Sequence, residues 1–151
     1  MGTKADAELD PLSLERQVCF ALAVTNRAVL AVYRPLLEPL GLTYPQYLAL
    51  SALWAEDGQT VGQIGAALML DSNTLTPLLK RLEQAGWLRR QRDPADERQV
   101  RLWLTEAGQA LGLQAASVPG CFLDLTGLSR DDAAALRDGL AALRERLRPR
   151  G

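Results

Sequence analysis

The stretch LDSNTLTPLLKRLE, residues 70–83, decides the fold of this chain. Asp71 and Ser72 are residue types that cap helix N-termini, and after them leucines recur at helical spacing as far as Leu82. Short polar side chains occupy the other positions, so the predicted helix has one apolar and one polar face. We expect it to end at Ala85-Gly86, because glycine is common just beyond a helix C-terminus.

A shorter helix is predicted immediately before it. Thr60 and Gln63 have the spacing of a capping box, in which two side chains satisfy backbone N–H groups at a helix start, and the helix is expected to run to Leu68. A short helix, a brief turn and a second helix with exposed polar residues predict a helix-turn-helix. Thr43 is expected to cap the helix before these, with Pro45 in its first turn.

The period of the sequence changes after Gly86. Residues 87–92 are an arginine-rich strand candidate, and residues 93–97 have turn chemistry. Apolar residues then alternate with Gln99, Arg101 and Trp103 in a second strand. Two strands around a charged tip, directly after the helix-turn-helix, predict a wing. The expected fold class is therefore mainly α with a two-stranded β wing, a winged helix-turn-helix.

Leucine-rich segments flank this part on both sides. Residues 12–40 are predicted to form a long first helix that Pro35 kinks or ends, and residues 105–148 a fifth helix that ends near residues 118–120 and a last helix that starts at Ser129. The last helix has four leucines on one face: Leu136, Leu140, Leu143 and Leu147. A small winged-helix core, residues 43–104, cannot cover both segments. We therefore expect residues 1–151 to form one domain whose terminal helices hold a homodimer together.

Local charge favours nucleic-acid binding, although the net charge of the whole chain is −1. Between Asn73 and Arg101, seven positive and four negative residues give a net charge of +3. A recognition helix enters the major groove with its N-terminus, and an arginine at a wing tip can enter the minor groove. The alternative is that the arginines form a solvated face. The residues predicted to contact DNA are Asp71, Ser72, Asn73, Thr74, Thr76, Lys80, Arg81, Arg90, Arg92, Asp96 and Arg98.

Residues from about 15 to 121 resemble the MarR family of winged-helix repressors, and more narrowly its organic-hydroperoxide-sensing, OhrR-like branch. The matching segments are residues 14–20, 33–37, 41–48, 70–81 and 96–98. The last of these is similar to the family's wing motif, in which the aspartate braces the arginine. The resemblance implies a homodimer that binds a pseudo-palindromic operator in double-stranded DNA and represses a peroxide-detoxifying gene.

Cys19 is the candidate sensor of an organic hydroperoxide, because tyrosine hydroxyls can donate hydrogen bonds to a thiolate. Tyr33 follows Cys19 by fourteen residues, about 21 Å along an unbroken helix. A contact would therefore join Cys19 to Tyr33 of the other subunit, and the same reasoning extends to Tyr44. The resembling family has its peroxide-reactive cysteine and two interacting tyrosines at these positions, and Ala23 stands where it often has a further tyrosine. The alternative is that these residues are ordinary core.

Cys121 is the candidate resolving thiol. A sulfenic acid condenses with a nearby thiol to form a disulfide, and some OhrR-like proteins have a second cysteine in this region. Pro119-Gly120 suggests that Cys121 lies on an irregular, movable segment. The alternative is a buried apolar cysteine among Val118, Phe122 and Leu123.

The absence of histidine argues against a Cys-His or Ser-His nucleophile and against a histidine-rich metal site, and no cofactor is expected. No apolar run is predicted to span a bilayer and no leader is recognised, so we expect a cytoplasmic protein with reduced thiols. Three other functions stay open: a repressor released by a small aromatic ligand, a thiol peroxidase that uses Cys19, and an architectural DNA-binding protein. The winged half would be idle in a peroxidase, so an enzyme is not expected.

Overall fold

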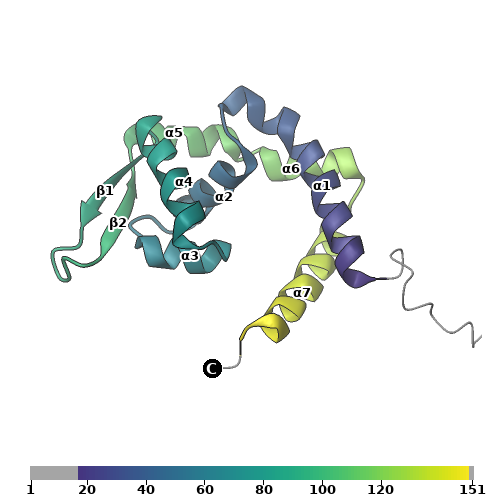
Figure 1. Ribbon diagram of the computed structural model, residues 1–151. Coiled ribbons are helices and arrows are strands. Elements are labelled where there is room, and N and C mark those ends of the chain that lie inside the picture. The colour runs from purple at the N-terminus through teal and green to yellow at the C-terminus, as the bar shows by residue number, and fades with distance from the viewer. Residues whose placement is uncertain (1–16, 150–151) are drawn as a thin grey trace, which may run out of the picture.

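The computed structural model describes residues 17–149, which form seven α-helices, one 3-10 helix and one two-stranded sheet (Figure 1). The predicted start of the first helix at Leu12 lies outside the described residues. The bounds are α1 Val18–Leu37, η2 Glu38–Leu40 (the 3-10 helix), α2 Tyr44–Ala55, α3 Val61–Leu68, α4 Ser72–Gln84, β1 Leu88–Arg92, β2 Val100–Leu104, α5 Glu106–Ala115, α6 Val118–Thr126 and α7 Arg130–Leu147.

The helix-turn-helix begins and ends at the residues that the sequence predicts. Thr43 with Gln46, and Thr60 with Gln63, form complete capping boxes at the starts of α2 and α3. Asp71 caps α4 by accepting the Thr74 N–H at 2.9 Å. Because these side chains satisfy N–H groups that lack a helical partner, the three helices have well-defined starts.

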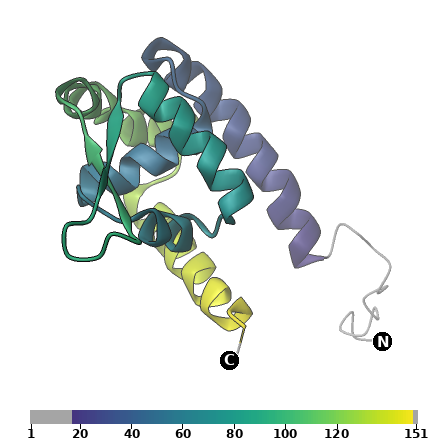
Figure 2. The same ribbon diagram turned by 60° about the vertical axis from the view of Figure 1, so that its left-hand side comes forward.

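The wing is an antiparallel hairpin in which Leu88 lies opposite Leu104 and Arg92 opposite Val100. The α2–α3 connection runs along β2, since the Leu102 N–H donates to the Gln59 carbonyl at 2.8 Å. Trp103 covers Gly58, where a Cβ atom would lie only 2.5 Å from the indole ring. The hairpin is therefore attached to the helix-turn-helix along β2, while its tip projects away from the helices (Figures 1 and 2).

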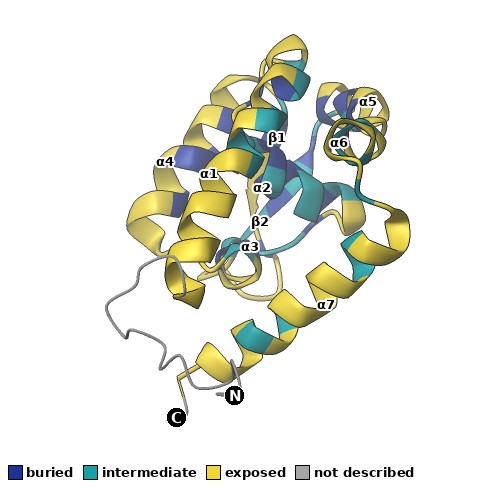
Figure 3. Cartoon of the chain, turned by 90° about the vertical axis from the view of Figure 1, so that its right-hand side faces the viewer, coloured by how far each residue is buried: buried dark blue, intermediate teal, exposed yellow. Residues whose placement is uncertain are grey.

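The core consists mainly of leucine side chains from α2, α4 and the hairpin, together with Leu37 of α1, Ile64 of α3 and Leu111 of α5. Leu50, Leu79, Leu82 and Leu102 are at most 1% exposed. Figure 3 shows that the buried residues gather in this half of the molecule, whereas α7 is exposed along most of its length. The winged half thus covers its large apolar side chains, except that of Met69, which is 63% exposed.

One of the two alternatives for Pro35 is excluded, and the predicted end of the fifth helix was wrong. Pro35 does not end the first helix, which continues to Leu37 before η2 and Gly41 close the segment. The fifth helix does not run to Val118: α5 ends at Ala115, and a separate helix, α6, starts at Val118 with Pro119 in its first turn. A proline in the first turn removes only an N–H that has no helical partner, so here it begins a helix rather than breaking one.

The terminal helices carry large apolar side chains that the chain itself does not cover. Val18 on α1 is 63% exposed, and Leu136 and Leu147 on α7 are 55% and 68% exposed. Phe20, Leu22, Val24 and Leu140 are also exposed. We call these seven residues the uncovered face. Large exposed apolar residues grouped on two helices are typical of a protein interface, as the dimer prediction requires. The predicted fold class, a mainly α winged helix-turn-helix with a two-stranded wing, is confirmed.

Candidate DNA interface and thiol site

Helix α4 presents the polar face that the sequence predicts. Leu75, Leu78, Leu79 and Leu82 are buried, whereas the predicted DNA-contacting side chains of this helix are exposed: Ser72, Asn73, Thr74, Thr76, Lys80 and Arg81. Asp71 is also exposed, but one of its oxygens is occupied by the Thr74 N–H. The helix therefore offers hydroxyls and an amide near its N-terminus and two cations farther along.

The arginines of β1 are not equivalent. Arg90 lies 3.7 Å from Glu83 of α4 and keeps a third of its side chain exposed. Arg89 donates to Gln91 and lies over the ring of Trp103, 5.9 Å from its centroid. Arg92 is exposed. The hairpin thus combines an arginine held against α4 with arginines that face solvent.

The wing tip places Arg98 fully in solvent, with 96% of its side chain exposed. Asp96 accepts the Arg98 backbone N–H at 3.1 Å, whereas its carboxylate lies 3.9 Å from the Arg98 guanidinium. The brace expected between these residues therefore acts mainly through the backbone. The guanidinium itself is left available for a partner.

Cys19 is exposed on α1, between Val18 and Phe20 of the uncovered face. It lies in the first turn of the helix, and Tyr33 lies near the other end. An unbroken helix of this kind places the two residues about 21 Å apart. Within one chain, Cys19 and Tyr33 therefore cannot meet.

Tyr33 and Tyr44 do lie together, in an aromatic cluster whose other members the sequence reasoning missed. The Tyr33 ring is 4.9 Å from Tyr44, 5.8 Å from Tyr47 and 4.8 Å from Phe122, which stacks on it at 21°. Tyr47 follows Tyr44 by one helical turn. The sequence alone therefore indicated that these two tyrosines lie on the same side of their helix. Phe122 comes from α6, and nothing local in the sequence pairs it with Tyr33.

Burial sets the protonation of this cluster. It raises the pKa of Tyr33 to about 12, with smaller contributions from Tyr47 and Tyr44. Burial also raises the pKa of Tyr44 and of Tyr47, the latter partly offset by a hydrogen bond with Ser51. All three hydroxyls are therefore protonated at neutral pH and can donate a hydrogen bond to an anion.

Cys121 lies in α6, partly buried, directly before Phe122. The predicted irregular segment is wrong, because residues 118–126 are helical. The α6 helix packs on α1, so it brings Cys121 to the neighbourhood of Tyr33. The structure describes no disulfide within the chain, and both thiols of residues 17–149 are free.

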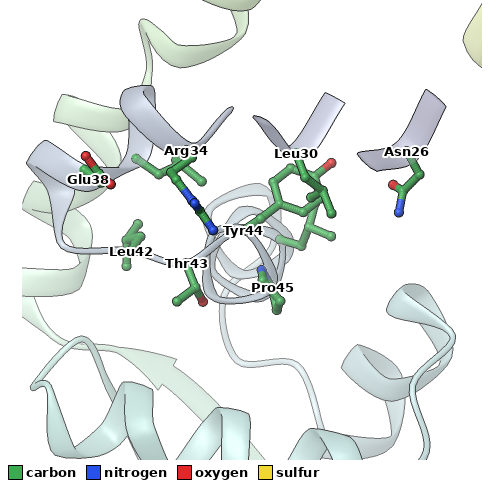
Figure 4. A pocket seen from close by; sticks show the side chains of 10 residues that line it. Asn26, Leu30, Arg34, Glu38, Leu42, Thr43, Tyr44 and Pro45 are labelled. Atoms are coloured by element: carbon green, nitrogen blue, oxygen red, sulfur yellow. The ribbon is translucent and has the colours of Figure 1, made fainter. Parts of the chain in front are cut away.

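A pocket of about 660 Å³ opens between α1 and the start of α2. Figure 4 shows Leu30 and Arg34 pointing from α1 toward Tyr44 and Thr43 below them. The other lining residues are Asn26, Leu37, Glu38, Leu42, Pro45 and Leu48. The pocket therefore combines apolar walls with one guanidinium and one tyrosine ring.

One stretch of the described chain, Val18–Leu40, is long and apolar enough to cross a membrane by length and composition alone. The expectation that no run reaches this length was therefore wrong. The criterion is weak evidence of a span, since helices that pair with protein meet it too. The stretch also carries Asn26, Arg27 and Arg34. No group of three or more potential metal-ligating residues occurs within residues 17–149.

A polar recognition helix followed by an arginine-rich hairpin defines this chain as a winged-helix protein of the DNA-binding regulator class. The MarR family model matches residues 42–100. The chain is 45% identical over 140 residues to the organic hydroperoxide resistance transcriptional regulator of Bacillus subtilis (strain 168), covering 93% of this chain and 95% of that protein. It is 48% identical over 141 residues to the HTH-type transcriptional regulator TtmR of Methylorubrum extorquens (strain PA1), covering 93% and 72%. The chain belongs to the MarR family.

Solved structures agree with this assignment. Reduced AbfR bound to DNA matches with a TM-score of 0.70 and 39% identity, over 89% of this chain and 94% of that chain. Disulfide-formed AbfR matches with a TM-score of 0.61 and 38% identity, over 89% and 91%. Structural relatives of this kind are dimeric, and the fold and relatives are those of transcription regulators, not of enzymes.

Proposed function

We propose that this protein is a dimeric repressor that leaves its operator when an organic hydroperoxide oxidises Cys19. The observation that carries the proposal is the position of Cys19: it is exposed on the uncovered face of α1, while Tyr33 lies near the far end of that helix, in contact with Tyr44 at the start of α2. A second copy that covers this face can bring its tyrosines to the thiol. The sensing pocket is then shared between subunits.

The DNA-binding part of the proposal rests on α4 and the wing. Two copies of α4, related by a two-fold axis, would occupy successive major grooves about 34 Å apart on a pseudo-palindromic operator. The exposed polar residues of α4 contact bases and phosphates, and Arg98 enters the minor groove. AbfR, a structural relative, is described as bound to DNA in its reduced form. A regulator of this kind acts in the cytoplasm.

The redox step transfers two electrons from sulfur to the peroxide. The Cys19 thiolate attacks the terminal peroxide oxygen, the O–O bond breaks, the alkoxide takes up a proton to leave as an alcohol, and sulfur becomes a sulfenic acid. The neutral hydroxyls of Tyr33 and Tyr44 suit this step, because they donate hydrogen bonds to the thiolate or to the peroxide. Val18, Phe20 and Leu22 offer an apolar setting, so an alkyl peroxide is preferred to hydrogen peroxide.

Cys121 is proposed as the resolving thiol. It directly precedes Phe122, whose ring stacks on Tyr33 at 4.8 Å, so a Cys19 that docks at Tyr33 of the other subunit also comes near Cys121. The Cys121 thiol then attacks the sulfenic sulfur, a disulfide forms and water leaves. Because a disulfide needs Cα atoms within about 7 Å, its formation shifts α1 against the partner's α6. That shift spoils the spacing of the two recognition helices.

The pocket beside Tyr44 favours a second candidate function. Apolar walls and the Arg34 guanidinium are the features that a small aromatic acid would need. In this alternative, a phenolic acid bound between α1 and α2 releases the operator and Cys19 is inert.

A mobility-shift titration on the promoter beside the gene separates the two candidates. We expect cumene hydroperoxide to release wild-type protein at concentrations at which hydrogen peroxide does not. Cys19→Ser should bind the same DNA and stay bound in the peroxide, because a hydroxyl forms no sulfenic acid. Cys121→Ser is the matched control: it keeps Cys19, and it should lose the covalent dimer seen on non-reducing gels. Release of Cys19→Ser by peroxide contradicts the proposal, and release of wild type only by a phenolic acid supports the alternative.

A further inference from the structure

Asp93 is the one buried charged residue in the described part of the chain, with 8% of its surface exposed. It follows β1 directly, at the base of the wing loop. One carboxylate oxygen accepts the Ala95 N–H at 2.9 Å, and the other accepts the Arg101 Nε–H at 2.8 Å. A buried carboxylate is costly unless it is paired and hydrogen-bonded, and here both oxygens have a donor.

Arg101 extends this contact to the helix-turn-helix. Its Nη1 donates to the Gly58 carbonyl at 2.8 Å, in the turn between α2 and α3. One guanidinium therefore holds the wing loop through Asp93 and the α2–α3 turn through Gly58. Its planar fork makes both contacts at once.

The same aspartate shapes the wing loop. The Asp93 N–H donates to the Gln99 carbonyl at 2.9 Å, and the Asp93 carbonyl accepts the Asp96 N–H at 3.2 Å. Asp96 in turn accepts the Arg98 N–H at 3.1 Å. An unbroken series of hydrogen bonds thus runs from the α2–α3 turn, through Arg101, Asp93 and Asp96, to the backbone of Arg98.

The charge of Asp93 argues that this arrangement has a role in DNA binding. The Ala95 N–H, and then Arg101, hold the pKa of Asp93 below its usual range, so the side chain is ionised at neutral pH. A negative charge on the arginine-rich hairpin repels phosphates and by itself weakens DNA binding. We therefore expect Asp93 to favour DNA binding in some other way. The series of hydrogen bonds links it to the wing tip, where Arg98 lies.

We propose that Asp93 and Arg101 are positioning residues for the DNA contact of Arg98. They fix the wing loop against the helix-turn-helix, so that Arg98 meets the DNA at a set distance from α4. The inference rests on the proposed function in one respect: that the chain binds DNA through α4 and Arg98. Neither Asp93 nor Arg101 is required to touch the DNA itself.

The test is operator binding by Asp93→Asn, measured over a range of salt concentrations. Asparagine keeps the size of the side chain and can still accept the Ala95 N–H, but it loses the ion pair. Electrostatics alone predicts tighter binding, because one negative charge is removed. Positioning predicts weaker binding instead: affinity about tenfold lower and a salt slope reduced by about one unit, as for loss of the Arg98 contact in the minor groove. Glu97→Gln, which removes an exposed carboxylate of the same loop, is the matched control and should bind as tightly as wild type or more tightly.

Two further variants separate positioning from folding. The double variant Asp93→Asn/Arg98→Ala should bind DNA with the affinity of Arg98→Ala alone. Once the Arg98 guanidinium is gone, Asp93 has no DNA contact left to position. Arg101→Lys keeps the charge but cannot hold Asp93 and Gly58 together, so it should behave like Asp93→Asn. Titration with DNA under stoichiometric conditions measures the concentration of active protein. Affinities calculated with that concentration are not affected by any unfolded fraction.

The outcomes distinguish the inference from the proposed function. Unchanged or tighter binding by Asp93→Asn and Arg101→Lys, with Arg98→Ala still weak, would overturn the positioning role alone. Additive losses in the double variant would do the same. If Arg98→Ala binds like wild type, the wing does not contact DNA, and both the DNA interface and the positioning role fail. Should Asp93→Asn not fold, Arg101→Lys decides the question.

Discussion

The two halves of this molecule differ in how completely one chain can build them. In the winged half, α2, α3 and α4 each have a side-chain cap, the core leucines are buried, and the hairpin is attached along the α2–α3 turn. In α1 and α7, large apolar residues stay exposed. The winged half is thus complete in one chain, whereas the terminal helices need a second copy. A chemical change at the dimer interface can therefore move two intact DNA-binding halves without unfolding either.

The largest expected effect is a loss of stability when a cavity is created in the core of the winged half. Leu82→Ala removes a side chain with 0% exposure, and we expect a loss of about 2–5 kcal/mol in the free energy of unfolding. Leu147→Ala, at a residue that is 68% exposed, should cost less than about 1 kcal/mol at dilutions where the chain is monomeric. Urea unfolding of both variants measures the difference. Equal losses would show that α7 belongs to the core of its own chain.

A charge on the uncovered face should break the dimer while sparing the winged half. In Leu140→Glu, a carboxylate replaces an apolar residue that is 42% exposed on α7, and burying it in an interface costs several kcal/mol. We expect a monomer at micromolar concentration by light scattering, with an unchanged helical circular dichroism spectrum. Ala142→Glu introduces the same charge on the opposite, exposed face of α7 and should remain dimeric. A dimeric Leu140→Glu would place the interface elsewhere.

A smaller effect should separate two arginines of the winged half. Arg98→Ala is expected to weaken operator binding about tenfold and to lower the salt slope by about one unit, because a minor-groove cation is lost. Arg90→Ala should weaken binding less, since Arg90 already lies 3.7 Å from Glu83. Fluorescence anisotropy with labelled operator measures both. A reversed order would mean that β1, and not the wing tip, makes the main cationic contact with the DNA.

The smallest effect is a pH dependence at the junction of the halves. The pKa of Tyr33 is raised to about 12 from an ordinary value of 10.0. A raised pKa in the folded state means that its stabilising contribution is complete below pH 10 and is lost as pH rises toward 12. Tyr33→Phe should therefore flatten the loss of stability across this window in urea unfolding at fixed pH. An identical pH profile in wild type and Tyr33→Phe would show that the hydroxyl is not desolvated.

The winged half was largely predictable from sequence because its signals are local. Capping boxes, the Asp71 cap and the alternation in β2 each lie within a few residues, and the helices and strands fall within a residue or two of the predicted positions. The site was predictable only in part. The Tyr33–Phe122 stack and the Asp93–Arg101–Gly58 contact join residues that no periodic pattern relates. Pro119 was interpreted as the end of the fifth helix. Proline is common both just after one helix and in the first turn of the next, so the local sequence does not distinguish the two.

The central claim, that the thiol of one copy works with the tyrosines of the other, has a direct test. We would purify a heterodimer of one Cys19→Ser chain and one Tyr33→Phe chain, using two affinity tags, and measure the rate at which cumene hydroperoxide oxidises its single Cys19. A shared pocket pairs that cysteine with the intact Tyr33 of the Cys19→Ser chain, so the rate should equal the wild-type rate per site. The Tyr33→Phe homodimer should react about tenfold more slowly, since a hydrogen bond to a charged group is lost. A heterodimer that reacts as slowly as the Tyr33→Phe homodimer would contradict the account, because it would place both residues of the pocket in the same chain.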